Sequence, residues 1–371
     1  MSTSHTDLPA FTPAEALSPA KRVLITGAAG QIGYSLIPLV ASGAVCGSQT
    51  PVDIVLLDIP QALPSLEGIV MEIQDGAYPL VRSIITTDSL EVAFKGTQVA
   101  LMVGGFPRLA GMDRKDLLTK NAQIFVAAGK ALDQYGDRDC KVCVVANPAN
   151  TNCFIMKDNC PSIPAENFTC LTRLDHNRAL WQLASKAKVP VGDVARVTIW
   201  GNHSNTMVPD VDQALVRTSA GVVSARSAIK AAMEEGKDSD EAVSTWISGT
   251  FVPTVQTRGA EVIRVRQKSS AMSAANAVAD HVRNWLSTVP SERVRANDWV
   301  SMGIISKGEY GIQPGLVFSY PVQIDTNGKI KVVENLELSE AVKAGLKATE
   351  AELASERDMY FTIKAELAAQ Q

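Results

Sequence analysis

Strand-like and helix-like patterns alternate over the first 150 residues of the chain. The apolar runs are KRVLIT (21–26), VDIVLLD (52–58), TQVALMVGG (97–105) and KVCVVANPAN (141–150), the last running into a loop. Apolar residues at helical spacing lie between them, over residues 31–43, 63–77 and 116–135. Apolar strands that alternate with helices are typical of parallel β-α-β units. The pattern therefore predicts an α/β fold built on a doubly wound parallel sheet.

The pattern changes after about residue 160. Helical segments dominate near residues 175–188, 224–236, 238–248 and 270–287, and a long final helix is expected over 338–368. Three late apolar runs, near residues 298–304, 314–323 and 328–333, are typical of antiparallel strands. We therefore expect a second, α+β domain. The predicted division is a flexible lead over 1–20, a first domain over 21–171 and a second domain over 172–371.

Composition adds little to this picture. The chain has 371 residues, 46% of them hydrophobic, and a net charge of -4. This charge does not favour a nucleic acid or an anionic membrane as a partner. No apolar run reaches transmembrane length. Residues 1–20 lack the signature of a signal or transit peptide, so we expect a cytoplasmic protein.

The six cysteines are too sparse for a disulfide framework in a chain of this length. Cys140 and Cys143 form a C-x-x-C pair, a spacing that also occurs in redox and metal sites. Because Cys143 lies inside an apolar run, we favour ordinary buried thiols. A redox or metal role is the alternative, although no second pair completes a zinc site and we expect no metal.

The segment GAAGQIG (27–33) joins the first predicted strand to the helix that follows it. Gly27 would allow a tight turn, Gly30 would let a pyrophosphate approach the backbone, and Gly33 would let helix and strand pack closely. The N–H groups at the start of the helix favour phosphate. Asp58 ends the second strand, where a carboxylate accepts ribose hydroxyls and repels a 2′-phosphate. This Rossmann-type pattern predicts NAD rather than NADP, bound by Gly27, Gly30, Gln31, Ile32, Gly33 and Asp58.

The stretch RLDHNR (173–178) is rich in charged and polar residues. Asp175 and Arg178 are three residues apart, so a helix places them on one side. His203 follows a predicted strand end, and a nearby carboxylate would fix its tautomer for acid–base chemistry. A purely structural histidine is the alternative. The other polar members are expected on the helix surface or in an interface, namely Arg173, His176 and Asn177.

Two arginines, Arg108 and Arg114, lie in GGFPRLAGMDRKD (104–116), just after the end of a predicted strand. Ligands bind at this edge of an open α/β sheet. A glycine-containing loop with arginines indicates a lid that closes over an anion. A solvated basic loop is the alternative.

Together these motifs resemble the malate dehydrogenases, of the cytosolic type, within the lactate/malate dehydrogenase superfamily. The resemblance covers residues 21–366 and rests on GAAGQIG, LLD (56–58), PRLAGMDRKDLL, NPANTN (147–152), TRLDHNRA (172–179), IWGNHSN (199–205) and SSAMSAANA (269–277). It implies reversible hydride transfer between (S)-malate and NAD, giving oxaloacetate and NADH, within malate metabolism and the tricarboxylic acid cycle. It also implies a homodimer.

The resemblance assigns roles to five charged residues. His203 would accept the proton in malate oxidation, oriented by Asp175. Arg178 would hold the C1 carboxylate of the substrate in a bidentate contact. Arg108 would hold the distal carboxylate and so select a four-carbon diacid, and Arg114 would close over the site and polarise the reacting carbonyl.

The resemblance also implies three further binding residues. Asn147 would bind the substrate near the nicotinamide, with Ser270 close by, and Asn121 would contact the cofactor. Three positions depart from the family pattern. Gly105 stands where alanine is common, Ala128 where glutamine is common near the cofactor, and Ala146 where glycine precedes the asparagine.

Two other functions compete with this one. One is a lactate or other 2-hydroxyacid dehydrogenase, which would have no use for the charge of Arg108. The other is a dinucleotide-binding protein that has lost catalysis and serves as an interaction module. The complete set of charged residues at family spacing favours the malate enzyme over both.

Overall fold

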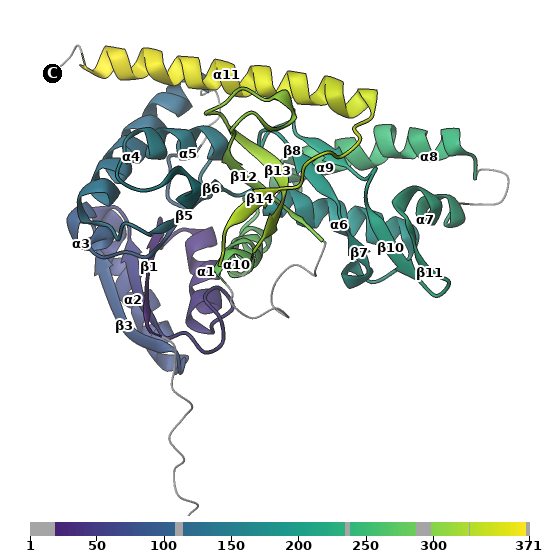
Figure 1. Cartoon of the computed structure of the whole chain (residues 1–371). Helices are drawn as coiled ribbons and strands as arrows, with labels where there is room; N and C mark the ends of the chain where they lie inside the picture. The colour runs from purple at the N-terminus through teal and green to yellow at the C-terminus, as the bar shows by residue number, and fades with distance from the viewer. Residues whose placement is uncertain (1–18, 108–113, 234–237, 287–297, 326, 369–371) are drawn as a thin grey trace, which may run out of the picture.

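A nine-stranded sheet forms the centre of the protein, in the order β14-β13-β12-β6-β5-β4-β1-β2-β3 (Figure 1). The computed structural model describes residues 19–107, 114–233, 238–286, 298–325 and 327–368. The strands of this sheet are β1 (Lys21–Thr26), β2 (Val52–Leu57), β3 (Val81–Thr87), β4 (Val99–Met102), β5 (Lys141–Val144), β6 (Phe168–Cys170), β12 (Val300–Ile305), β13 (Val317–Ile324) and β14 (Ile330–Val332).

Six of these strands, β3-β2-β1-β4-β5-β6, are parallel, which confirms the predicted doubly wound sheet. The helices between them are α1 (Gln31–Ala41), α2 (Leu63–Asp75), α3 (Leu90–Phe94), α4 (Arg114–Tyr135) and α5 (Ala149–Asp158). Successive residues of β1 point to opposite faces, so Leu24 joins one apolar core while Val23 and Ile25 join the other. Burial on both faces explains why β1, β2, β4 and β5 are largely apolar.

The late strands are antiparallel, as predicted, but they extend the first sheet. β12 pairs with β6, and β13 and β14 follow outward. At this junction a Cβ atom on Gly303 would lie 2.1 Å from Sγ of Cys170, so only glycine allows the two strands to approach. The predicted domain boundary near residue 171 therefore falls within a continuous sheet and stays a prediction.

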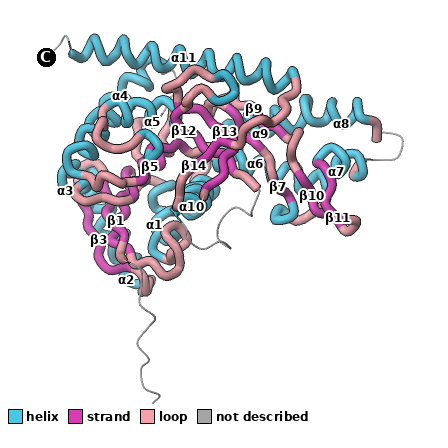
Figure 2. Tube along the Cα trace, viewed as in Figure 1, coloured by secondary structure: helices cyan, strands magenta, loops and turns pink. Residues whose placement is uncertain are grey.

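Two small antiparallel sheets lie beside the main one. One consists of β7 (Val194–Ala195), β10 (Leu215–Thr218) and β11 (Gly221–Ser224), and the other of β8 (Thr198–Trp200) and β9 (Val208–Asp210). The later helices are α6 (Arg173–Ala187), α7 (Ala225–Ala231), α8 (Asp240–Trp246), α9 (Val252–Arg266), α10 (Met272–Leu286) and α11 (Glu340–Ala368) (Figure 2).

The sequence pattern missed three helices, α3, α5 and α9. The expected loop after β5 becomes helical at Ala149, and α9 occupies a stretch with no predicted element. In α5 the polar segment Asn150–Asn152 is buried. Polar residues at buried positions obscure the spacing of apolar residues by which a helix is recognised in the sequence. No helix in the described part of the chain is long and apolar enough to cross a membrane.

Candidate active site

The turn after β1 is built from close backbone contacts. Gly27 has a φ of +62°, and a Cβ atom there would lie 2.6 Å from Cα of Gly104 after β4. A Cβ atom on Gly33 would lie 2.5 Å from the carbonyl oxygen of Gly27. Gly30 begins α1 without a side-chain cap, and the first turn of α1 contains no acidic residue. The N–H groups of this turn therefore remain available to an anion.

Asp58 follows the end of β2 and lies against the same turn. Its Oδ2 accepts a hydrogen bond from the N–H of Ala29 at 2.9 Å, and its Oδ1 accepts one from the N–H of Ile59 at 2.8 Å. Each carboxylate oxygen can accept a further hydrogen bond. The glycine turn and this carboxylate therefore fit the phosphates and the ribose of a dinucleotide.

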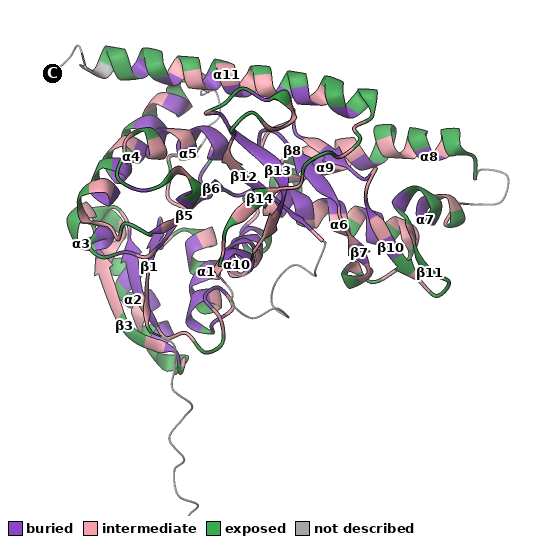
Figure 3. Ribbon diagram, viewed as in Figure 1, coloured by how far each residue is buried: buried purple, intermediate pink, exposed green. Residues whose placement is uncertain are grey.

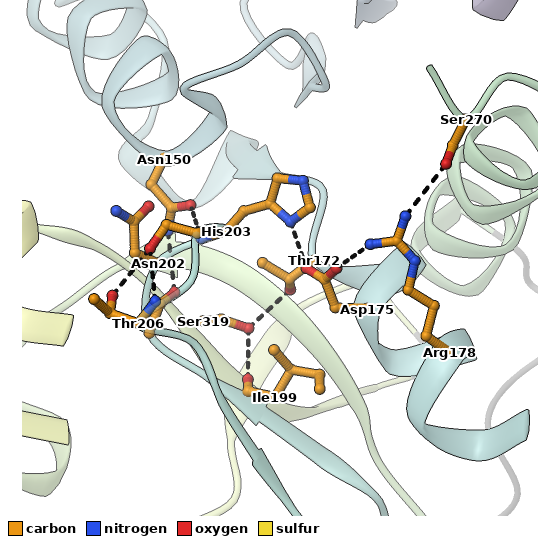
Figure 4. Close-up of polar contacts among 12 residues, drawn as sticks. Asn150, Thr172, Asp175, Arg178, Ile199, Asn202, His203, Thr206, Ser270 and Ser319 are labelled. Atoms are coloured by element: carbon orange, nitrogen blue, oxygen red, sulfur yellow. Dashed lines mark hydrogen bonds and ion pairs between the residues drawn. The ribbon is translucent and has the colours of Figure 1, made fainter. Parts of the chain in front are cut away.

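Asp175 lies at the centre of the candidate site and has no exposed surface. Its Oδ1 accepts a hydrogen bond from Nη1 of Arg178 at 3.0 Å, and its Oδ2 contacts Nδ1 of His203 (Figure 4). Arg178 also donates from Nη2 to Oγ of Ser270 at 3.3 Å, across to the start of α10. The carboxylate directs the Nδ1 proton of His203 toward itself, so Nε2 is free to exchange a proton with a ligand.

Helix α6 and the loop after β8 bring these residues together. Asp175 lies in the first turn of α6, where a negative charge is favoured by the helix dipole. The N–H of His203 donates to Oδ1 of Asn150 at 2.9 Å. Asn150 in turn donates from Nδ2 to the carbonyl oxygens of Gly201 at 3.2 Å and Val317 at 2.9 Å. The sequence analysis missed Asn150, and only its burial in a polar stretch marks it.

The other described histidines are unsuited to acid–base work. His176 and His281 are buried, and burial lowers the pKa of His176 well below its ordinary value and that of His281 to about 3. The side chain of His203 is 17% exposed and pairs with Asp175. Among the described histidines, His203 alone combines a carboxylate partner with access to solvent.

Three residues on α6 were expected on the helix surface or in an interface: Arg173 and Asn177 are half-buried and contact α10, whereas a surface position is wrong for His176. His176 is buried, with Nδ1 3.0 Å from Oγ of Ser301 on β12. Arg173 donates to Oδ1 of Asn284 at 2.7 Å, and Asn177 donates to Asp280 at 3.2 Å, both on α10. Helix α6 packs against both α10 and β12, and these two elements cover the side of α6 that carries polar residues.

Asn121 on α4 fixes the segment that leads into the arginine loop. Its Oδ1 accepts from the N–H of Phe106 at 2.8 Å, and its Nδ2 donates to the carbonyl oxygen of Phe106 at 3.2 Å. Asn121 is fully buried, so its contact with a cofactor stays a prediction. Arg108 lies outside the described residues, as does the side chain of Arg114 at the start of α4.

The three departures from the family pattern are all local packing features. A Cβ atom on Gly105 would lie 2.8 Å from Cβ of Ala146 and 2.9 Å from Oδ1 of Asn121. Ala128 is 3% exposed and packs in an apolar core. Asn147, next to Ala146, is exposed at the end of β5, while Ser270 is half-buried. The absence of a side chain at Gly105 thus leaves room for the methyl group of Ala146.

The cysteines are buried free thiols, as favoured from the sequence. Burial raises the pKa of Cys143 to about 12 and that of Cys140 still further. Thiolates are therefore disfavoured, which weighs against redox chemistry at this pair. Within the described ranges no group of histidine, cysteine and acidic residues could hold a metal ion.

Comparison with known proteins gives a consistent result. Residues 21–169 match the NAD binding domain of the lactate/malate dehydrogenases, and residues 172–363 match their alpha/beta C-terminal domain. Malate dehydrogenase 3, cytoplasmic, of Arabidopsis thaliana is 47% identical over 92% of this chain and 95% of that protein. The cytoplasmic malate dehydrogenase of Gallus gallus is 49% identical over 91% of this chain and 96% of that protein.

Solved structures of similar proteins have the same fold. The malate dehydrogenase of Naegleria fowleri superposes with a TM-score of 0.84 at 39% identity, covering 94% of this chain and 100% of that one. The lactate dehydrogenase of Trichomonas vaginalis, in complex with NADH and oxamate, gives a TM-score of 0.85 at 34% identity, with the same coverages. This chain therefore belongs to the lactate/malate dehydrogenase family of oxidoreductases, and its first half is the NAD-binding domain of that family.

Proposed function

We propose that the protein is an NAD-dependent malate dehydrogenase that interconverts (S)-malate and oxaloacetate. The observation that carries this proposal is the contact of one buried carboxylate, Asp175, with both His203 and Arg178. A proton acceptor and an anion-binding guanidinium are thereby held side by side. The reaction of a 2-hydroxy acid requires both, one at the hydroxyl group and one at the adjacent carboxylate.

The cofactor would lie along the C-terminal edge of the parallel strands. The turn from Gly27 to Gly33, with Gln31 and Ile32, would receive the pyrophosphate, and Asp58 the adenosine ribose. Asn147 and Asn121 would lie toward the nicotinamide end. Bound NAD would supply the hydride acceptor for malate oxidation and the hydride donor for the reverse direction.

His203 would carry the proton. In malate oxidation Nε2 accepts the proton of the C2 hydroxyl, and in oxaloacetate reduction the same nitrogen returns it. Asp175 accepts the Nδ1–H throughout and therefore holds the ring in the tautomer that leaves Nε2 unprotonated before oxidation. Partial exposure lets the ring exchange this proton with solvent after the product leaves.

The arginines would recognise the substrate anions. Arg178 would form a bidentate contact with the C1 carboxylate, with Ser270 orienting its guanidinium. Arg108 would hold the distal carboxylate, and Arg114 would polarise the reacting carbonyl. A lactate substrate would leave Arg108 without its anionic partner. The fold is compatible with either substrate, and it is the charge of Arg108 that disfavours the lactate alternative.

The relatives named as cytoplasmic support a cytoplasmic location for this protein as well. We expect a homodimer and no nucleic acid partner, in line with the sequence analysis.

NADH oxidation, followed at 340 nm, tests the proposed function. The wild-type protein is assayed with oxaloacetate and with pyruvate, and each assay is repeated with NADPH. We expect fast turnover with oxaloacetate and NADH alone. Preferred turnover of pyruvate would overturn the substrate assignment. NADH binding without turnover of either substrate would support the binding-module alternative.

A further inference from the structure

Helix α11 has a continuous buried stripe along one side. Its residues alternate in spacings of four and three, which places them on one helix face: Val342, Leu346, Thr349, Leu353, Glu356, Tyr360 and Ile363. Five of them are hydrophobic. Thr349 and Glu356 are the polar members of the stripe. Figure 3 shows the contrast between this buried stripe and the exposed outer side of α11.

The polar residues of this stripe contact the loop that contains His203. The N–H of Asn202 donates to Oγ1 of Thr349 at 2.8 Å. The side-chain Nδ2 of Asn202 donates to Oε2 of Glu352 at 2.9 Å and to Oε1 of Glu356 at 3.4 Å. Both neighbours of the histidine in sequence are involved, because Oγ of Ser204 also donates to Glu352.

Glu352 holds the far end of the same loop. Its Oε2 accepts a hydrogen bond from Oγ1 of Thr206 at 2.6 Å, in addition to those from Asn202 and Ser204. A single carboxylate oxygen is thus the common acceptor for three residues that surround His203. A charged oxygen forms stronger hydrogen bonds than a neutral one, so this contact suits a carboxylate better than an amide.

Glu356 is also connected to His203 indirectly, through residues of α5. One of its carboxylate oxygens, Oε2, accepts a hydrogen bond from Oγ1 of Thr151 on α5. The preceding residue, Asn150, accepts the backbone N–H of His203 at 2.9 Å. Glu356 is only 4% exposed. It therefore contacts both the loop of His203 and the helix that binds the backbone of His203.

A glycine allows α11 to come this close. Gly201 precedes the loop with a φ of +91°, and a Cβ atom there would lie 2.2 Å from Cγ2 of Thr349. The backbone of Gly201 is held on its other side by Ser319 of β13, through hydrogen bonds of 3.1 and 2.9 Å. The start of the loop is thus fixed between β13 and α11.

We infer that Glu352 and Glu356 are positioning residues for His203, and that α11 aligns the imidazole with the substrate. Burying a carboxylate is costly, and an apolar residue of similar size is often at least as stabilising. The buried charge of Glu356 is therefore better explained by the loop it orders than by stability. Glu352 lies beside the stripe and is half-buried, and its role rests on its three hydrogen bonds to the same loop. The inference concerns the same site as the proposed function and rests on it for its catalytic consequence.

The test uses the full-length variants Glu352→Gln and Glu356→Gln, with Glu340→Gln as the control. Glu340 lies on the same helix, and its side chain is 90% exposed and paired only locally with Lys343. We expect kcat for oxaloacetate reduction to fall roughly 10-fold or more in both test variants, because small displacements of a catalytic group are costly. The Kd for NADH, which the proposed function places at the glycine turn after β1, should stay within about twofold.

A second readout does not depend on turnover. The chain has four histidines, so ¹⁵N-histidine spectra contain few ring signals, and His203→Asn assigns the relevant pair. We expect the His203 signals to shift or broaden in Glu352→Gln and Glu356→Gln, and to be unchanged in Glu340→Gln. Unaltered His203 signals and unaltered kcat in a folded variant would overturn the inference. If the wild type lacks malate dehydrogenase activity, the spectra still decide the positioning role.

Discussion

Gly105 and Ala146 lie so close together that only one of them can carry a methyl group, because a Cβ atom on Gly105 would lie 2.8 Å from Cβ of Ala146. The two residues follow the ends of neighbouring parallel strands, β4 and β5, at the edge where the candidate site lies. The sequence analysis expects each of them to depart from the family pattern. In space they compensate, since the small residue faces the larger one.

This contact predicts a double-mutant cycle. Gly105→Ala should destabilise the protein by about 1–3 kcal/mol, because the added methyl group also presses on Oδ1 of Asn121. Adding Ala146→Gly should recover most of the loss. Urea unfolding of the wild type, both single variants and the double variant measures the coupling energy. Strictly additive effects would show that the two side chains do not compete for the same space.

Replacing Asp175 should abolish most of the activity without unfolding the protein. In Asp175→Asn an amide replaces the acceptor of the His203 proton, so the ring tends toward the wrong tautomer. We expect kcat to fall roughly 10²- to 10⁴-fold, by analogy with other histidine–carboxylate pairs. Asp280→Asn is the matched control, because Asp280 contacts α6 through Asn177 and pairs with Arg283 on its own helix. Steady-state oxaloacetate reduction measures both, and a folded Asp175→Asn variant with near wild-type kcat would refute the assigned role.

Arg108 should decide the choice of substrate. Arg108→Gln removes the charge expected to face the distal carboxylate, so kcat/KM for oxaloacetate should fall by roughly 10²-fold or more. Some pyruvate reduction should appear in the same variant. The kinetics of both 2-oxo acids with NADH measure this change. If kcat/KM for oxaloacetate stayed the same, the distal carboxylate would have to be bound elsewhere.

The buried histidines should make the protein sensitive to mild acid. Burial lowers the pKa of His176 and His281 in the folded state below the ordinary value of 6.5, so the unfolded chain binds their protons first. Their contribution to stability is present above pH 6.5 and is lost as the pH falls toward about 3, the folded pKa of His281. Each can lower the free energy of unfolding by at most about 1.4 kcal/mol per pH unit.

Urea unfolding at pH 7, 6 and 5 checks this expectation. In His281→Gln the decline between pH 7 and 5 should be shallower than in the wild type, whatever the stability of the variant at pH 7. An equally steep decline would mean that other groups cause the acid sensitivity.

Most of the dinucleotide-binding half was predictable because its signals are local. Strand β1, the glycine turn and α1 follow one another in sequence, and the spacing of apolar residues and glycines specifies each of them. Asp175 and Arg178 are three residues apart, so a helix alone suffices to place them together. The antiparallel late strands were also predicted, although not their union with the first sheet.

The residues that the sequence analysis missed depend on contacts between distant segments. His176 is buried because β12 and α10, each more than about 90 residues later, cover its side of α6. Asn150, Glu352 and Glu356 are ordinary polar residues until the chain folds around the loop of His203. No local pattern distinguishes them from solvated side chains.

The sequence by itself determined the elements, the dinucleotide turn and the residue types of an acid–base and anion-binding site. Only the tertiary structure decided that His203 joins the pair of Asp175 and Arg178, that Gly105 and Ala146 crowd each other, and that α11 reaches the loop of His203. The physical reason is the separation along the chain over which each kind of interaction acts. Backbone periodicity and turn geometry act over a few residues, whereas burial and hydrogen-bond partners depend on segments brought together by the whole fold.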